Sequence, residues 1–313
     1  MAGMTPFFRD LSKAELHLHL EGSVEPDTWS ALDPSLAAEE GRDRYRFIGF
    51  DGFLRCFKWC VERLRTAEDY AFITARLLDR LAEQNIRYAE ITLSAGAVLW
   101  RNRDLDAVYA AVRGASKARP DIETRWILDA IRNFGPEPAM EVARFGAARV
   151  EDGVVAFGIG GDEERGPAHW FGEVYEFARG AGLRVNAHAG ETVGPESVWA
   201  ALRIGAERIG HGIRSIEDPA LLRELRQRNV PLEICITSNV MTGAVESLRA
   251  HPVRKLYDAG VPIILNTDDP GIFGVTLGGE FELAAREFGF SETELREIAA
   301  NGFRFAFSTA SPV

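Results

Sequence analysis

Two histidines stand two positions apart in the segment AELHLHLEGS, residues 14–23, which otherwise has the composition of a buried strand. Side chains at positions i and i+2 of a strand point to the same side, so His17 and His19 face one side together. Such a pair at the end of a strand can offer two nitrogens to one metal ion, whereas a single strand histidine is more often a hydrogen-bonded core residue. The pair taken alone leaves both interpretations open.

Polar residues of the same kinds stand at the ends of later apolar runs. His188 and Glu191 lie in NAHAGE, His211 lies in IGHG, and Asp268 and Asp269 lie in NTDDP. If these runs are strands of one α/β barrel, their carboxyl ends meet at the face where barrel enzymes place their active sites. An Asp-Asp-Pro sequence can be an ordinary turn, but the company of the strand-end histidines favours a functional cluster.

This grouping predicts a metal site. Three neutral imidazoles and one carboxylate form a Zn²⁺ site of the catalytic kind, with one position left for water. We expect His17, His19, His188 and Asp268 to be the ligands of one zinc ion. A metal in this role lowers the pKa of its bound water from about 15.7 towards 7, which makes hydroxide available at neutral pH.

Two of the strand-end residues that are not predicted ligands, Glu191 and His211, could transfer protons. His211 is free to act as a base or as an electrostatic partner. Glu191 lies three residues beyond a predicted ligand, on a turn where a shielded carboxyl can stay protonated and serve as an acid. The two remaining histidines, His169 and His251, are expected to be surface or loop residues without a role.

The elements that would position these residues are eight short β-rich runs separated by amphipathic helical stretches. This alternation predicts a (β/α)8 TIM barrel that forms a single domain over residues 1–313. The predicted helices include residues 71–84, 106–118 and 221–228. The predicted strands are residues 13–20, 87–94, 123–131, 154–162, 184–191, 208–212, 231–239 and 262–270.

The segment between the first two predicted strands, residues 21–86, is too long for one crossover and is expected to be a helical insertion. Its aromatic-rich stretch FDGFLRCFKWCVERL has two interpretations. It could form a hydrophobic lid over a pocket at the barrel mouth, or it could be the core of the insertion itself. The residues concerned are Phe50, Phe53, Leu54, Phe57 and Trp59.

Composition and charge restrict the classes of partner. Hydrophobic residues make up 46% and charged residues 27% of the chain, which is an ordinary globular composition. The formal net charge of -11 disfavours nucleic acid and anionic membranes, because either partner would repel the average surface. A small-molecule partner is therefore expected, and the oligomeric state is left open.

The chain also lacks the patterns of export or membrane insertion. No stretch is long and apolar enough to span a bilayer, and the N-terminal residues do not form a signal peptide, which predicts a cytoplasmic protein. The three cysteines are an odd number, and Cys56 and Cys60 are spaced to share one helical face. We expect reduced packing residues there rather than a disulfide framework or a metal site.

Taken together, the motifs resemble those of the adenosine deaminase family of metal-dependent amidohydrolases. They occur in the family's order along the whole chain. They are KAELHLHLEGS (13–23), GDE (161–163), HAGE (188–191), GHG (210–212), TSNVMTG (237–243) and NTDDP (266–270). The resemblance implies one Zn²⁺ that activates water for attack at C6 of a 6-aminopurine, with release of ammonia and formation of the 6-oxo product.

The resemblance also implies a role for each matching residue. Glu191 would protonate the ring nitrogen N1, which makes C6 electrophilic, and His211 would assist the zinc-bound water. Asp268 would ligate the zinc and orient the attacking hydroxide. Asp269 would bond the purine N7, and the backbone of Gly161 would meet N3. The segment GFLRCF resembles the family's lid helix, so covering the substrate is implied for Phe53, Leu54 and Phe57.

One departure from the family pattern bears on the substrate. Adenosine-specific members usually have Asp after the His-x-His-Leu run, to hold the ribose 5′-hydroxyl, and this chain has Glu21. Members that act on free adenine, or on 6-aminodeoxyfutalosine in menaquinone biosynthesis, tend to have Glu there. TSNVMTG is more similar to the nucleoside-acting branch, whereas ITLSAGAVLW (91–100) is unlike the Tyr-Ser-Pro run of adenosine-specific members. We therefore favour 6-aminodeoxyfutalosine, a 5′-modified adenosine, followed by adenosine, with adenine as the alternative and Glu21 as a 5′-side specificity residue.

A second departure lies in the predicted fourth strand. In FGIGGDE, Gly158 stands where an Asp is common in the family. Without a side chain at this position, we expect that strand end to be looser.

Other functions on the same fold are less well supported. A binuclear amidohydrolase would need a bridging Lys at the end of the fourth strand, and VVAFGIGGDEE contains none. The deaminases that flip bases out of nucleic acid use a Pro-Cys-x-x-Cys motif, which does not occur in this chain. A zinc- or nucleoside-binding protein without turnover is the non-enzyme alternative. Such a protein would be free to lose Glu191 and His211, and both are present.

Overall fold

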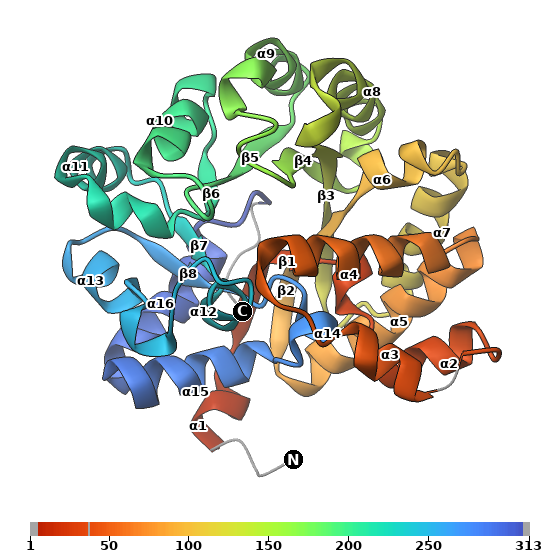
Figure 1. Cartoon of the computed structure of the whole chain (residues 1–313), viewed down its shortest axis with the longest axis horizontal. Coiled ribbons are helices and arrows are strands. Elements are labelled where there is room, and N and C mark those ends of the chain that lie inside the picture. The colour runs from red at the N-terminus through yellow and green to blue at the C-terminus, as the bar shows by residue number, and fades with distance from the viewer. Residues whose placement is uncertain (1–5, 37, 309–313) are drawn as a thin grey trace.

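Eight parallel strands follow one another in sequence order around a nearly closed barrel, with helices on the outside (Figure 1). The computed structural model describes residues 6–36 and 38–308. The strands are β1 (Lys13–His19), β2 (Ile86–Leu93), β3 (Glu123–Ile131), β4 (Val154–Gly160), β5 (Arg184–Ala189), β6 (Arg208–His211), β7 (Leu232–Ile234) and β8 (Ile263–Leu265). The arrangement confirms the predicted (β/α)8 barrel.

Helices connect the strands and cover the outer face of the barrel. The longer ones are α4 (Gly49–Arg63), α5 (Ala67–Glu83), α7 (Leu105–Lys117), α8 (Pro136–Ala147), α9 (Gly172–Gly180), α10 (Pro195–Ile204), α11 (Pro219–Arg228), α15 (Leu277–Phe288) and α16 (Glu292–Arg304). The shorter ones are α1 (Pro6–Asp10), α2 (Trp29–Leu32), α3 (Ala38–Arg44), α6 (Ala95–Trp100), α12 (Ile236–Met241), α13 (Val253–Asp258) and α14 (Pro270–Phe273). Capping boxes begin α5 and α16, where two side chains and two backbone amides satisfy one another.

The long connection between β1 and β2 contains four helices, α2 to α5. The last of them, α5, packs against β2 and α7 and so acts as the crossover helix of this βα unit. The helix α4 contacts the 3-10 turn Glu21–Ser23 that directly follows β1. This contact brings α4 to the carboxyl end of the barrel, where the predicted catalytic residues lie.

The last two strands are shorter than the sequence predicted. The predicted seventh strand, residues 231–239, is extended only to Ile234, because the chain turns into α12 at Ile236. The predicted eighth strand, residues 262–270, is extended only to Leu265. The residues beyond both strands therefore belong to the loops and short helices that surround the barrel mouth.

The side chain of Asn266 explains why β8 ends early. Its Oδ1 accepts hydrogen bonds from the backbone N–H groups of Leu16, at 2.8 Å, and His17, at 3.1 Å. A side chain thus replaces the backbone ladder between the first and last strands. Beyond it, the barrel is closed by a parallel bridge between Leu18 and Asp268.

All three cysteines lie within the described ranges, where they are buried and none forms a disulfide. Cys56 and Cys60 face the core from α4, which agrees with the predicted packing role. Within residues 6–36 and 38–308, no helix has the length and apolar character needed to cross a membrane.

Charged side chains fill part of the barrel interior. Arg208 lies between two carboxylates, with Nη2 2.5 Å from Glu90 Oε2 and Nε 2.6 Å from Glu233 Oε1. All three residues are fully buried. Because a buried charge is stable only with its partners, the strands β2, β6 and β7 that carry these residues are tied together by this network.

We predict that Arg208→Met destabilises the fold by about 3–5 kcal/mol, because it leaves the carboxylates of Glu90 and Glu233 buried without a cation. Chemical denaturation measures the free energy of unfolding. The matched control is Arg42→Met, which removes an exposed ion pair with Asp27 and should cost less than about 1 kcal/mol. Equal denaturation midpoints for the two variants would contradict the structural role of the network.

Candidate active site

A cavity of about 390 Å³ opens at the carboxyl ends of the barrel strands. Its polar side is formed by strand-end residues that the sequence singled out, and its apolar side is formed largely by α4. The predicted site residues among the polar lining are His19, His188, Glu191, His211, Asp268 and Asp269, and the other polar lining residues are Lys58, Ser94, Asp129, Asn133 and Arg165. The cavity therefore lies where barrel enzymes place their chemistry.

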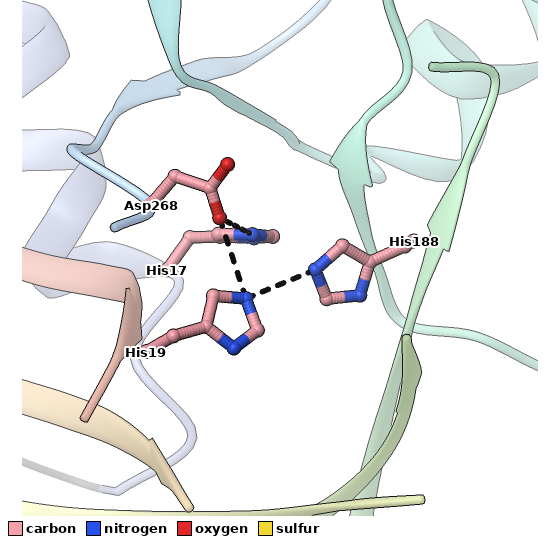
Figure 2. Close-up of side chains that lie close together, drawn as sticks. All are labelled: His17, His19, His188 and Asp268. Carbon is pink, nitrogen blue, oxygen red and sulfur yellow. Dashed lines mark hydrogen bonds and ion pairs between the residues drawn. The ribbon is translucent and has the colours of Figure 1, made fainter. Parts of the chain in front are cut away.

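The four predicted metal ligands lie together at the bottom of this region. Ligand atoms of His17, His19, His188 and Asp268 all lie within 4.8 Å of one another. Asp268 Oδ1 is 3.3 Å from Nε2 of both His17 and His19. Figure 2 shows the His19 and His188 rings facing each other from opposite strands, with their Nε2 atoms 3.1 Å apart.

Two hydrogen bonds orient the imidazoles towards a common centre. His17 Nδ1 is 2.7 Å from Glu233 Oε2, and His188 Nδ1 is 3.0 Å from the carbonyl oxygen of Ile159. Both partners can only accept, so each Nδ1 carries a hydrogen, and in the neutral form of each ring Nε2 presents a lone pair to the cluster. Lone pairs that converge at such short range repel one another unless a cation lies between them. This donor set fits a bound metal ion.

The protonation states of the three histidines are not alike. Burial lowers the pKa of His188 to about 4 and holds that of His19 well below its usual value, so both are neutral, as metal ligands must be. Burial alone would also lower the pKa of His17, but Asp268 and Glu233 outweigh it and raise the value to about 10. A metal ion that binds here must displace a proton from His17.

Backbone strain is concentrated at two of the predicted site residues. His211 has φ 61° and Asp268 has φ 65°, the left-handed region that non-glycine residues rarely adopt. His211 is the last residue of β6, and Asp268 lies three residues beyond β8, where the chain turns at the barrel mouth. The unusual backbone directs both side chains into the cavity.

Glu191 is buried on the turn after β5, and Glu163 holds that turn in place. Glu163 accepts hydrogen bonds from the N–H groups of Gly190 at 2.8 Å and of Glu191 and Thr192 at 2.9 Å. Burial, followed by the negative charges of Asp268 and Glu163, raises the pKa of Glu191 well above its usual value. The raised pKa favours the protonated form of Glu191, and its Oε2 lies 3.6 Å from His211 Nε2.

Asp268 receives support from a residue that sequence reasoning did not assign. The hydroxyl of Ser238 donates a hydrogen bond to Asp268 Oδ2 at 2.6 Å. The neighbouring Cys235 also lies close to Asp268, but burial raises the pKa of its thiol. The protonated thiol instead donates to the carbonyl oxygen of Glu233, at 3.7 Å. We therefore do not count Cys235 among the metal ligands.

Asp269 lines the cavity beside Asp268, and a glycine makes room for it. Its Oδ1 is buried and has no hydrogen-bond partner in the part of the chain that is described. A Cβ atom at Gly22 would lie only 1.6 Å from this oxygen. Glycine is thus required at position 22 because the Asp269 side chain lies too close for any Cβ atom, and not because of the backbone angles of Gly22.

Glu21 is not among the residues that line the cavity. Its carboxylate is buried behind the cavity wall and accepts a hydrogen bond from the N–H group of Ser94 at 3.1 Å. Ser94 itself lines the cavity. Burial raises the pKa of Glu21 to about 7. Direct contact of Glu21 with a substrate stays a prediction, and the structure shows it positioning Ser94.

The residues of the aromatic stretch divide between the cavity wall and the core. Phe50, Phe53, Leu54 and Phe57 line the cavity, and Phe53 stacks on Phe273 with ring centroids 5.3 Å apart. In contrast, the side chain of Trp59 is buried away from the cavity, in edge contact with Trp29 in the core.

Gly158 and His251 have surroundings that the sequence did not indicate, although His251 does lie in a loop as expected. The strand β4 continues unbroken through Gly158, because the space above it is filled by its neighbours: a Cβ there would lie 2.7 Å from Asn186 Oδ1 and 2.9 Å from Asp129 Oδ1. Asp129 lines the cavity, and burial raises its pKa to about 7. His251 is only 4% exposed, whereas His169 is exposed as expected.

Several supporting residues were missed because their sequence context resembles a core strand or a loop. Glu233 and Glu90 are acids within apolar strand runs, and that pattern is the one signal that could have identified them. Asn239 belongs to the quoted TSNVMTG motif but was given no role. Its amide lies between His211 and His251.

Comparison with known proteins agrees with this geometry. The sequence model of the family described as adenosine deaminase matches residues 12–312. The aminodeoxyfutalosine deaminase of Streptomyces coelicolor is 39% identical over 97% of this chain and 82% of its own length. The crystal structure of adenine deaminase from Arthrobacter aurescens is 32% identical, with a TM-score of 0.88 over 95% of this chain and 94% of its own. An amidohydrolase from Burkholderia ambifaria with bound Zn is 28% identical, with a TM-score of 0.88 over 96% and 87%.

We predict that Gly22→Ala lowers kcat/KM by roughly 100-fold, because the added methyl group displaces the Asp269 carboxylate from the cavity wall. Steady-state kinetics measures the loss, and elemental analysis should show unchanged metal content because no ligand contacts Gly22. Gly180→Ala, where a Cβ meets open space, is the control and should retain full activity. Full activity in Gly22→Ala would show that the position of Asp269 does not matter.

Proposed function

This chain belongs to the adenosine deaminase family, and from that premise we propose that it deaminates a 6-aminopurine nucleoside at C6 with the help of one Zn²⁺ ion. The observation that carries the proposal is the pairing of a buried Glu191, whose pKa burial raises, with a cluster of converging imidazoles at the same cavity. The first can donate a proton, and the second can hold a metal. Hydrolytic deamination needs both.

His17, His19, His188 and Asp268 would hold the zinc ion. Their three nitrogens and one oxygen are a donor set that zinc accepts, and the amidohydrolase from Burkholderia ambifaria contains bound Zn. When bound, the metal activates a water molecule for nucleophilic attack. The hydrogen bond from Ser238 fixes the orientation of the Asp268 carboxylate while it does so.

The remaining residues would bind and polarise the purine. Glu191 donates its proton to N1, which draws electrons from C6 and favours attack there. N7 is an acceptor, so its partner must be a donor. Burial and the charge of Asp268 raise the pKa of Asp269, which keeps a proton on Asp269 for this bond. Gly161, whose φ of 105° only glycine adopts readily, brings its backbone to the cavity for N3.

The mouth of the cavity supports a substrate larger than adenosine. Trp100 and Phe134 lie there with ring centroids 5.9 Å apart, and they remain 40% and 41% exposed. Lys58 also lines the cavity, with Nζ 5.3 Å from the Trp100 ring centroid, and it makes no ion pair with any residue that the structure describes. Exposed aromatic rings beside a free cation suit a flat 5′ substituent that carries negative charge.

We therefore favour 6-aminodeoxyfutalosine as the substrate, with adenosine second, and a role in menaquinone biosynthesis. The aminodeoxyfutalosine deaminase of Streptomyces coelicolor supports this order. Adenine deamination is the alternative, supported by the Arthrobacter aurescens enzyme. Adenine has no 5′ substituent and would therefore make no contact with Trp100 and Phe134 at the mouth of the cavity. A small purine substrate and a cytoplasmic location complete the proposal.

Ammonia release by the zinc-loaded protein, measured in parallel with 6-aminodeoxyfutalosine, adenosine and adenine, tests the substrate. We expect the highest kcat/KM for the first. We also expect Lys58→Met to raise KM about tenfold for 6-aminodeoxyfutalosine and to leave adenosine unaffected, because only a charged 5′ substituent reaches Lys58. A preference for adenine would select the alternative, and no turnover with stoichiometric zinc would support the non-enzyme reading.

We predict that Glu191→Gln keeps its metal and loses activity by about 10²–10⁴-fold, because the amide cannot donate the proton that N1 needs. In the wild-type enzyme the active form of Glu191 is protonated. Since burial raises its pKa, activity should persist well above the usual titration range of a carboxyl and fall as pH rises through the raised pKa.

The control for this variant is Glu164→Gln, at an exposed acid next to the GDE motif, which should leave the rate unchanged. Metal content is measured on both proteins. Wild-type activity in Glu191→Gln with full metal content would rule out Glu191 as the acid.

A further inference from the structure

We infer that Asn239 and His251 form a buried relay that fixes the tautomer of His211, with its hydrogen on Nε2, and so make His211 a hydrogen-bond donor to the reacting centre rather than a base. The inference rests on the proposed function for the identity of the reaction, but the tautomer follows from hydrogen-bond geometry alone. Asn239 and His251 are positioning residues in this proposal, since neither lines the cavity among the residues described.

The relay is anchored by a backbone amide. The N–H group of Val253 lies 3.2 Å from His251 Nδ1 and can only donate. His251 Nδ1 must therefore present its lone pair, which leaves the hydrogen of a neutral ring on Nε2. The burial of His251 favours this neutral form and lowers its pKa to about 3.

The second link fixes the amide of Asn239. His251 Nε2 is 3.1 Å from Asn239 Oδ1, and since this nitrogen carries the hydrogen it donates to the amide oxygen. The orientation of the amide is then determined, because its oxygen faces His251 and its nitrogen faces His211. The oxygen and the nitrogen of an Asn amide are nearly alike in shape, so the amide could sit either way round. The donor at His251 Nε2 selects the orientation in which the oxygen faces His251.

The third link sets the tautomer of His211. Asn239 Nδ2 lies 2.9 Å from His211 Nδ1, and an amide nitrogen can only donate. His211 Nδ1 therefore accepts, and the hydrogen of the neutral ring is on Nε2. Burial holds the pKa of His211 well below its usual value, in agreement with a neutral ring.

The hydrogen on Nε2 decides between the two roles that the sequence left open for His211. His211 Nε2 is the ring nitrogen on the side of Glu191, whose Oε2 is 3.6 Å away, and His211 lines the cavity. A nitrogen that already carries hydrogen cannot take a proton from water. It can instead donate a hydrogen bond to the oxygen that attacks C6 and stabilise the negative charge that develops there.

The helix α12 couples this relay to the metal cluster. Asn239 and its neighbour Ser238 both lie on α12, and Ser238 donates to Asp268. The N–H group of Val245 donates to the carbonyl oxygen of Asn239 at 2.8 Å, which holds the loop after the helix against it. A single short helix thus carries the partners of two site residues, Asp268 and His211.

Nitrogen-15 NMR of the zinc-loaded enzyme, labelled at histidine, tests the relay because the shifts of the two ring nitrogens identify the tautomer. We expect the Nε2–H form for both His211 and His251 in the wild-type enzyme. In Asn239→Asp, a carboxylate faces His211 Nδ1 and can only accept, so His211 should change to the Nδ1–H form. We expect kcat to fall at least tenfold with little change in KM, because the lost interaction acts on the transition state.

A second variant guards against a general loss of structure in the first. His251→Phe keeps a ring against Phe288, whose centroid is 5.9 Å away, but removes the donor that orients the Asn239 amide. The His211 signals should then show a mixture of tautomers. His169→Gln, at the exposed histidine, is the control and should change neither the His211 signals nor kcat.

The outcomes separate the relay from the proposed function. An Nδ1–H form of His211 in the wild type, or an unchanged tautomer in Asn239→Asp, would overturn the relay whatever the substrate is. An Nε2–H form that changes in both variants supports the relay. If that result came with no ammonia release from any 6-aminopurine, the proposed function would be wrong and the relay would stand.

Discussion

The buried carboxylate of Glu233 is the contact on which the rest of the site depends. One oxygen orients His17, at 2.7 Å, and the other is paired with Arg208, at 2.6 Å. Burial alone would raise the pKa of Glu233, but Arg208 and His17 outweigh it and lower the pKa, so the group is an anion inside the barrel. The negative charge fixes the His17 tautomer and increases the basicity of the imidazole as a ligand. The same ion network connects the metal cluster to the interior of the fold.

The seam where the barrel closes is also the place where the predicted metal ligands meet. The N–H group of Asp268 donates to the carbonyl oxygen of His17 at 3.0 Å, and that of His19 donates to the carbonyl oxygen of Asp268 at 2.8 Å. These bonds join residues about 250 positions apart, and Asn266 adds two more across the same seam. The ligands can reach their geometry only when the first and last strands are in register. Folding of the barrel and assembly of the site are therefore one event.

This coupling explains what the sequence could and could not predict. The eight strands and the convergence of His17, His19, His188 and Asp268 were predictable, because period-two strands place polar residues at one face and imidazole with carboxylate is a recognisable donor set. The ends of β7 and β8 were not, because Asn266 and the turn into α12 act through contacts across the barrel. His251 stands in a loop sequence, and its burial depends on a partner 12 residues away. Glu21 has the expected residue type but points at a backbone amide that only the fold brings near.

The pKa values of two adjacent aspartates shift in opposite directions in this cavity. Burial raises the pKa of both Asp268 and Asp269, but hydrogen bonding and charge from the histidines, led by His17, lower that of Asp268 well below its usual range. Asp269 has no such partner, and the anion next to it holds its pKa well above the usual value. Two carboxylates this close cannot both be ionised at low cost. In the proposed mechanism Asp268 is an anionic ligand and Asp269 is a protonated donor to the purine. The histidines around Asp268 favour its anion, and that anion in turn favours the protonated form of Asp269.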